Sequence, residues 1–432
     1  MDALNTGNTA WMLASASLVL LMTPGLAFFY GGMVRGKSVL NIMMMSFGAL
    51  GVVGIIYMLW GYSMSFGTDV GGLFGNPFDF FGLKGLDDNA NALFSFDDLG
   101  VPAYVWVAFQ STFAIITVAL ISGSIPERVK FGAWMLFAGL WVTLVYFPLA
   151  HMVWGGGLLG AEGITESLST PLDFAGGTVV HINAGVAGLV LALIIGKRKG
   201  FGKEPMRPHN LPFVMLGAAL LWFGWFGFNA GSAGAANDQA GLAWITTTAA
   251  TAAAMAGWLI TEKIRDGHAT SLGAASGVVA GLVAIPPAAG FVSPVGALVI
   301  GLIAGVLCAL AVSLKYKFGY DDSLDVVGVH LVGGLWGTVS IGFFATADDL
   351  WAGSKAGLLY GGGVTQLLTQ VIVAVAAVVF SAVVTAVIAV AIKRTMGWRV
   401  SEEVEVNGID LAVHGETAYE TLGGARVTTE VK

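Results

Sequence analysis

Long apolar runs alternate with short polar segments along the whole chain. Each run has about 20 residues, the length that an α-helix needs to cross the hydrocarbon core of a bilayer. The pattern predicts an all-α polytopic membrane protein with eleven transmembrane helices, and an odd number places the two termini on opposite sides. The predicted spans are 10–32, 39–61, 101–124, 132–152, 176–196, 212–234, 241–261, 271–288, 294–314, 326–346 and 361–392.

Basic residues lie almost entirely on one side of this arrangement. If the C-terminus is inside, 18 of the 20 lysines and arginines fall in inside segments, and only Lys84 and Lys355 fall outside. Because basic residues mark the cytoplasmic side, we expect the N-terminus out and the C-terminus in. Residues 1–392 are predicted to form the membrane domain and 393–432 a cytosolic C-terminal regulatory tail. The first apolar run is too long for a cleaved signal peptide, so we expect a retained helix.

Composition supports this class of protein. Of the 432 residues, 56% are hydrophobic and 11% are charged, whereas a soluble domain has about 25% charged residues. The 62 glycines favour closely packed membrane helices. The single cysteine, Cys308, excludes an intrachain disulfide. The expected environment is the lipid bilayer, and no nucleic-acid partner is expected.

Two histidines occur in the same local pattern, H-x-x-x-G-x-x-G, which begins at His181 and again at His330. On a helix these three positions share one face, and glycines let two membrane helices approach closely. The motifs fall on the fifth and tenth spans, so the sequence predicts two inverted five-helix repeats followed by a final helix. Inverted repeats place a transport pathway at their interface, near the middle of the membrane. The alternative is two separate histidines, each hydrogen-bonded within its own bundle.

An aspartate precedes each of these histidines, Asp173 before His181 and Asp325 before His330. A carboxylate at a helix start suits the positive end of the helix dipole. We therefore interpret both aspartates as helix caps, with direct contact to a cation as the alternative for Asp173. His151, at the outer end of the fourth span, is interpreted as a structural residue.

Aromatic side chains supply a second pattern. Phe109 and Phe113 are four residues apart on the third span, and Phe228 and Ser232 have the same spacing on the sixth. Trp154 follows the fourth span on the outer side. Aromatic faces attract a cation that is losing its water, and a hydroxyl can bind it. The plainer interpretation of any one of these rings is ordinary packing.

Other chemistry is not supported by the residues. Neither histidine has a Cys, Asp or Glu beside it at helical spacing, so no metal and no cofactor are expected. An intramembrane hydrolase would need a nucleophile next to a histidine, and G-x-S-x-G does not occur. We therefore expect a transporter, not an enzyme.

Eight further segments of the chain have distinctive sequences: PGLAFFYGGMVRGK, FQSTFAIITVALISGSIPER, AHMVWGGG, LDFAGGTVVHINAG, RPHNLP, WFGFNAGSAG, DVVGVH and HGETAY. Together they resemble the ammonium transporter (Amt/Mep/Rh) family, in particular its bacterial Amt branch. The resemblance extends from Leu18 to about Tyr419. One departure is Ile285-Pro286-Pro287, where relatives often have a threonine before a single proline.

The resemblance implies an eleven-helix pore in each subunit, a homotrimer in the cell membrane and ammonium or methylammonium as substrate. It also implies a trimeric PII-type nitrogen-signalling protein that docks on the cytoplasmic face. For the site, it implies the following roles: Phe109, Trp154 and Ser232 recruit the cation, Phe113 and Phe228 form a gate, His181 and His330 line the pore, and Asp173 supports the outer site.

The implied mechanism is recruitment of NH4+, loss of a proton and passage of NH3 together with a proton. A bare ion would pay many kcal/mol to cross an apolar lumen, whereas neutral ammonia would not. Two alternatives stay open: an electroneutral ammonia gas channel, and an ammonium sensor that signals through its tail.

Overall fold

The computed structural model describes residues 4–86 and 99–419. In these ranges ten helices are long and apolar enough to cross a membrane, and Ser271–Ala284 is an eleventh, shorter apolar helix. The predicted all-α membrane fold with eleven spans is therefore confirmed. The described β-structure is a small hairpin formed by β1 (Asp69–Val70) and β2 (Phe74–Gly75).

Several spans consist of more than one helical segment, because π-helical or 3₁₀ turns interrupt or extend them. In chain order the spans are α1 (Thr6–Met33); α2 (Val39–Ile56), η1 (Tyr57–Gly61) and α3 (Tyr62–Phe66); α4 (Ala103–Ile121) and η4 (Ser122–Ser124); α5 (Phe131–Trp141), η5 (Val142–Tyr146) and α6 (Phe147–Trp154); η6 (Gly177–Ile182) and α7 (Asn183–Ile195); α8 (Leu211–Gly231); α9 (Asp238–Asp266); α10 (Ser271–Ala284); α11 (Pro294–Ala311) and α12 (Leu314–Phe318); η7 (Val327–Leu331) and α13 (Val332–Phe344); and α14 (Thr365–Thr395). Between and after the spans lie η2 (Phe81–Leu83), η8 (Leu358–Tyr360), α15 (Glu402–Asn407) and η9 (Asp410–His414).

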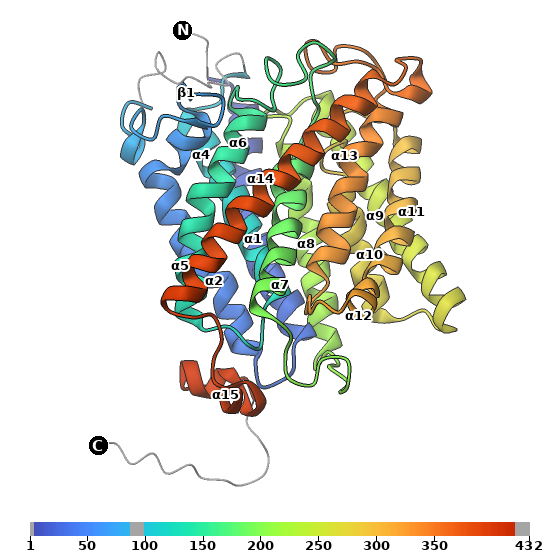
Figure 1. Ribbon diagram of the computed structural model, residues 1–432. Coiled ribbons are helices and arrows are strands. Elements are labelled where there is room, and N and C mark those ends of the chain that lie inside the picture. The colour runs from blue at the N-terminus through green and yellow to red at the C-terminus, as the bar shows by residue number, and fades with distance from the viewer. Residues whose placement is uncertain (1–3, 87–98, 420–432) are drawn as a thin grey trace.

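The helices form one bundle, and α14 crosses it diagonally against α7 and α13 (Figure 1). Helix α4 lies at its centre, since 94% of its most apolar stretch is buried, whereas only 33% of that of α14 is. Around this centre α1 packs against α4 and α8, and α9 packs against α10 and α11.

The two halves of the chain meet at the fifth and tenth spans. The contacts there are reciprocal: α13 packs on η6, α7 packs on η7, and η6 touches η7. Glycines make this approach possible, because a Cβ added at Gly185 would lie 2.4 Å from the backbone nitrogen of Leu331. A Cβ at Gly334 would lie 3.0 Å from that of His181. The reciprocal contacts are those expected of two inverted repeats.

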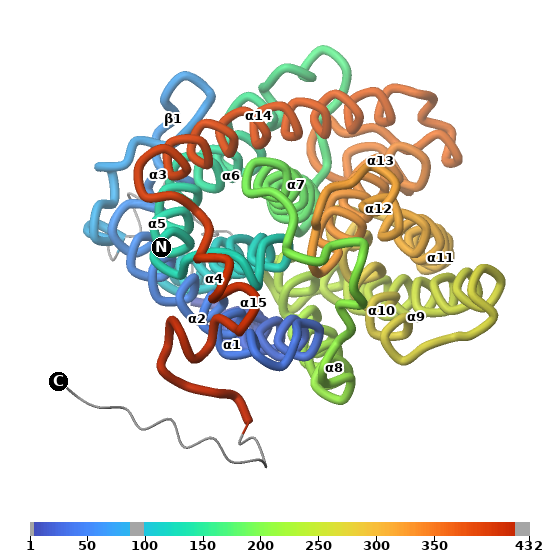
Figure 2. Tube along the Cα trace, turned by 60° about the horizontal axis from the view of Figure 1, so that its bottom comes forward, coloured from blue at the N-terminus to red at the C-terminus, as the bar shows by residue number. Residues whose placement is uncertain are grey.

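The beginning of α1 and the short helix α15 lie at opposite ends of the bundle (Figure 1). We call these ends the N-terminal face and the tail face. Figure 2, with the tail face turned forward, shows the chain running from α14 to α15, and the η9 turn that follows packs against α2, at its start. There the carboxylate of Asp410 accepts hydrogen bonds from the backbone N–H groups of Leu40 and Asn41, which caps α2.

A network of buried ion pairs joins four segments at the tail face. Arg198 donates to Glu127 at 2.9 Å and to Asp321 at 2.9 Å. Glu127 also pairs with Arg35 at 3.0 Å, and Arg128 lies 3.9 Å from Asp321. Because opposite charges alternate, each buried carboxylate has cationic partners.

Candidate functional site

The structure brings His181 and His330 together in the middle of the bundle. Their Nδ1 atoms lie 3.3 Å apart, and the two rings are nearly parallel at a centroid distance of 5.4 Å. Both side chains are buried. The alternative, in which each histidine is hydrogen-bonded only within its own half of the chain, is therefore wrong.

Each histidine sits in a π-helical turn, His181 in η6 and His330 in η7. A π-turn carries one extra residue relative to an α-turn, and such turns often occur at functional sites. Both turns continue directly into an α-helix, α7 after η6 and α13 after η7. Each half of the chain therefore positions its histidine in a π-helical turn that leads into an α-helix.

Asp173 caps η6, as the sequence predicts. Its two carboxylate oxygens accept hydrogen bonds from the backbone N–H groups of Gly176, Gly177, Thr178 and Val179, at 2.6–3.3 Å. These are the N–H groups that a helix start leaves without a partner inside the helix. The capping carboxylate is itself buried.

The prediction that Asp325 caps the tenth span is wrong. The cap is Asp322, which accepts from the backbone N–H groups of Val326 and Val327. Asp325 instead has a positive φ of 65° and accepts a hydrogen bond from the ammonium group of Lys315 at 2.7 Å. A residue in the left-handed region turns the chain before the helix begins, so the carboxylate three residues earlier reaches the free N–H groups.

A column of aromatic rings lies on the N-terminal-face side of the histidines. Phe113 and Phe228 are stacked, with centroids 4.1 Å apart and planes 13° apart. Phe109 meets Phe113 edge-on at 4.8 Å, and Trp154 lies 6.3 Å from Phe113. The next ring along is His181, 6.2 Å from Phe228. The predicted aromatic residues therefore form one continuous series that ends at the histidine pair.

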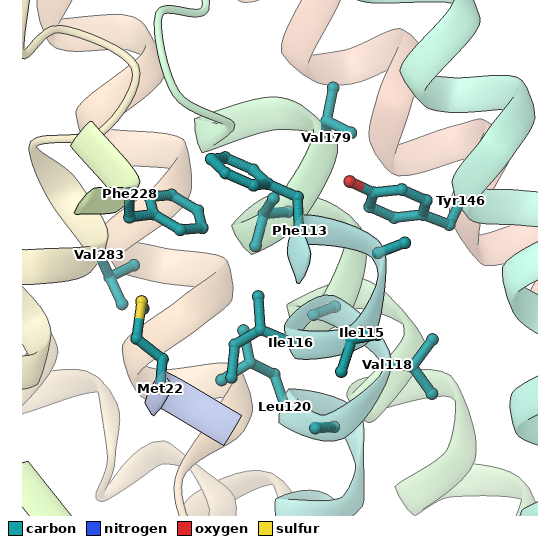
Figure 3. Close-up of a cluster of buried hydrophobic side chains, with 14 of the residues drawn as sticks. Met22, Phe113, Ile115, Ile116, Val118, Leu120, Tyr146, Val179, Phe228 and Val283 are labelled. Carbon is teal, nitrogen blue, oxygen red and sulfur yellow. The ribbon is translucent and has the colours of Figure 1, made fainter. Parts of the chain in front are cut away.

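Apolar side chains surround the stacked phenyl rings. Figure 3 shows Met22, Ile116 and Val283 next to Phe113 and Phe228, and all five side chains are buried. An ion would find no polar partner among these groups, so the surroundings disfavour a charged species.

The remaining predicted residues lie beside this column. The indole N–H of Trp154 donates to the carbonyl of Asp173 at 2.9 Å, which ties this indole to the aspartate that caps η6. The hydroxyl of Ser232 donates to the carbonyl of Phe228 at 2.8 Å, so its oxygen is left to accept a further hydrogen bond. Ser232 follows Gly231, where an added Cβ would lie 2.9 Å from the Phe109 ring.

Sequence reasoning missed two residues of this site. Trp225 stacks on His181 at 5.6 Å, and it precedes Phe228 by three residues, a spacing that shares a helix face. Asp322 stands eight residues before His330, just as Asp173 stands eight before His181. Both signals were present in the sequence.

One buried polar atom of the site, Nε2 of His181, has no hydrogen-bond partner within residues 4–86 and 99–419. Such an atom costs free energy unless a ligand or water binds it. Among the described residues, no three His, Cys, Asp or Glu side chains gather as metal ligands would. The free nitrogen therefore suits a small molecule that forms hydrogen bonds.

A multi-span helical bundle with apolar rings and paired histidines between its two halves defines a membrane transport protein. Comparisons with known proteins agree. The profile of the Ammonium Transporter Family matches residues 10–419. An ammonium transporter of Mycobacterium tuberculosis is 57% identical over 430 residues, covering 96% of this chain and 90% of the relative.

Solved structures show the same fold. The crystal structure of Saccharomyces cerevisiae Mep2 superimposes with a TM-score of 0.82 at 34% identity, covering 92% of this chain and 91% of that one. A structure described as a sensor Amt protein gives 0.84 at 28% identity, covering 94% and 98%. The chain belongs to the ammonium transporter family, and it is a multi-pass protein of the cell membrane.

Proposed function

We propose that this protein binds NH4+ at its outer face, removes a proton and conducts NH3 past the paired histidines, with the proton crossing as well. Membership of the family makes ammonium the substrate. The observation that carries the mechanism is the 3.3 Å contact between Nδ1 of His181 and Nδ1 of His330.

The contact determines what the pair offers to a ligand. Two neutral imidazoles bonded through Nδ1 share one proton, so one ring donates and the other accepts. The accepting ring then carries its own proton on Nε2, and the donating ring has a bare Nε2. Whichever way the proton lies, the pathway meets one donor and one acceptor. Ammonia needs both, because it has N–H groups and a lone pair.

The outer site would consist of Phe109, Trp154 and Ser232. Aromatic faces attract a partly dehydrated cation, and the free lone pairs of the Ser232 oxygen accept from its N–H groups. Methylammonium carries the same kind of N–H groups. Potassium has a similar radius but offers no hydrogen and no proton to lose. The stacked rings of Phe113 and Phe228 then act as an apolar gate.

Assembly and orientation complete the proposal. In this proposal the tail face lies in the cytoplasm, and the excess of basic residues on that side, read by the positive-inside rule, supports this. There residues 393–432, of which 420–432 lie outside the described residues, would act as a regulatory tail beside the membrane domain 1–392. A homotrimer, and a PII-type nitrogen-signalling protein docked on this face, are what the family resemblance favours.

The test compares currents in proteoliposomes after an ammonium pulse, with a potassium pulse as control. The two proteins compared are the wild type and a His181→Ala, His330→Ala double variant. We expect an ammonium-specific current that disappears or loses its selectivity in the double variant. An unchanged current in that variant would contradict the role of the pair.

Two other outcomes would favour other functions. A change of internal pH without current would indicate an electroneutral gas channel. The absence of both signals would favour an ammonium sensor, for which the similarity to the sensor Amt structure is the supporting observation.

A further inference from the structure

His151 lies in the last turn of α6, three residues before Trp154, and it is fully buried. Its Nδ1 lies 3.2 Å from the backbone carbonyl oxygen of Ser65, and its Nε2 lies 2.9 Å from Oδ1 of Asp69. A carbonyl oxygen only accepts hydrogen bonds, so Nδ1 must carry a proton.

The other nitrogen, Nε2, faces the carboxylate of Asp69. Hydrogen bonding to His151 lowers the pKa of Asp69, and the backbone N–H of Gly72 donates to the same carboxylate. The buried ring is therefore held at both nitrogens, by the Ser65 carbonyl and by a carboxylate whose side chain is 45% exposed.

These hydrogen bonds join three segments beside the outer site. Ser65 lies in the last turn of the second span, and Asp69 begins the β1–β2 hairpin. The His151 carbonyl accepts from Gly155 and Gly157, which follow Trp154. The hairpin and that loop are also linked directly, since the Leu158 N–H donates to the Gly72 carbonyl. The ring of His151 therefore links the last turn of α6 to the second span and to the hairpin through its two hydrogen bonds.

We propose that His151, paired with Asp69, is a positioning residue for the outer ammonium site and holds the indole of Trp154 in its binding orientation. The inference rests on the proposed role of Trp154.

The test measures the concentration dependence of ammonium currents in proteoliposomes for Asp69→Ala, His151→Gln and the double variant. We expect KM to rise about fivefold with Vmax nearly unchanged, and the double variant to be no worse than either single variant. Asp69→Glu, which keeps a carboxylate, should restore most of the affinity. Asp69 is half exposed, so its variants test the idea even if His151→Gln fails to fold.

Two controls separate the possible failures. Asp348→Ala removes a carboxylate that accepts from Ala356 in a different loop, and its KM should not change. Trp154→Leu should raise KM by itself. If Trp154→Leu does so while Asp69→Ala and His151→Gln do not, or if these two lower only Vmax, the positioning role is wrong. If Trp154→Leu leaves KM unchanged, the outer site itself is wrong, and the inference fails with it.

Discussion

At the scale of single residues, Asp173 connects two parts of the candidate site through its hydrogen bonds. Its carboxylate accepts hydrogen bonds from four backbone N–H groups at the start of η6, the segment that carries His181. Its own carbonyl accepts the indole N–H of Trp154. One residue therefore holds both the segment that carries His181 and the indole of Trp154, and its carboxylate lies at the positive end of a helical segment.

Replacing Asp173 by Asn should be severe although the two side chains have the same shape. The amide offers one accepting oxygen and turns an NH2 group toward N–H donors, so about two hydrogen bonds are lost and the donors repel. We expect a loss of about 2–4 kcal/mol of stability and of most transport. Thermal unfolding in detergent and ammonium flux in proteoliposomes would measure both.

The matched control is Asp238→Asn, an exposed aspartate in the first turn of α9. The free energy of unfolding of the Asp238→Asn variant should differ from that of the wild type by less than about 0.5 kcal/mol. Equal unfolding temperatures for the two variants would show that Asp173 is not a structural cap.

At the scale of elements, the fifth and tenth spans are the parts that bring the two histidines together. The sequence predicted that two glycine-lined faces would meet, because spacing alone places a histidine and two glycines on one side of a helix. It did not predict the π-turns η6 and η7, since one extra residue per turn leaves no mark in hydropathy. It also pointed to Asp325, because three aspartates precede His330 and only the positive φ of Asp325 decides that Asp322 is the cap.

Gly185→Ala tests this contact between the two spans. The added Cβ would lie 2.4 Å from the backbone nitrogen and 2.6 Å from the Cα of Leu331, and neither atom can rotate away. The turn that carries His330 must therefore shift. We expect a loss of about 1–3 kcal/mol and a reduced ammonium current.

Gly51→Ala is the control, because Gly51 also lies in a helix but has no atom within 4 Å of its added Cβ. There the lower backbone entropy of alanine should leave stability unchanged or raise it by about 0.5–1 kcal/mol. Full ammonium current in Gly185→Ala would mean that the histidine contact tolerates displacement.

At the scale of the whole molecule, the tail face holds distant segments together. The sequence marked off the tail by its polarity, but it did not indicate that Asp410 caps α2, because the partners are 369 residues apart. The same holds for the ion-pair network around Arg198, whose members come from four loops. Charge counts placed these residues on one side of the membrane, whereas their pairing depends on how the bundle folds.

Arg198→Gln should destabilise the whole protein. Arg198 is 7% exposed and its guanidinium contacts both Glu127 and Asp321, so its removal leaves buried carboxylates with too little positive charge. We expect a loss of about 3–5 kcal/mol. The control Arg265→Gln breaks an exposed pair with Asp266 and should cost less than about 1 kcal/mol. Similar unfolding temperatures for both variants would contradict a structural role of the network.

The pH dependence of stability tests the same network through its carboxylates. Burial alone would raise the pKa of Asp321, but its hydrogen bond to Arg198 and the charge of Arg128 hold the pKa below its ordinary range. A carboxyl whose pKa is lower in the folded state stabilises the fold above its unfolded pKa of about 4. That contribution is lost as the pH falls through the lower, folded pKa.

Asp321→Asn cannot titrate, so the difference in unfolding free energy between wild type and variant isolates this one group. We expect the difference to be constant between about pH 5 and pH 7 and to shrink below about pH 4. Denaturant unfolding of the detergent-solubilised protein across this range would measure it. A difference that instead grows as the pH falls would mean that the folded protein binds the proton more tightly than the unfolded chain. In that case burial, and not Arg198, would dominate the environment of Asp321.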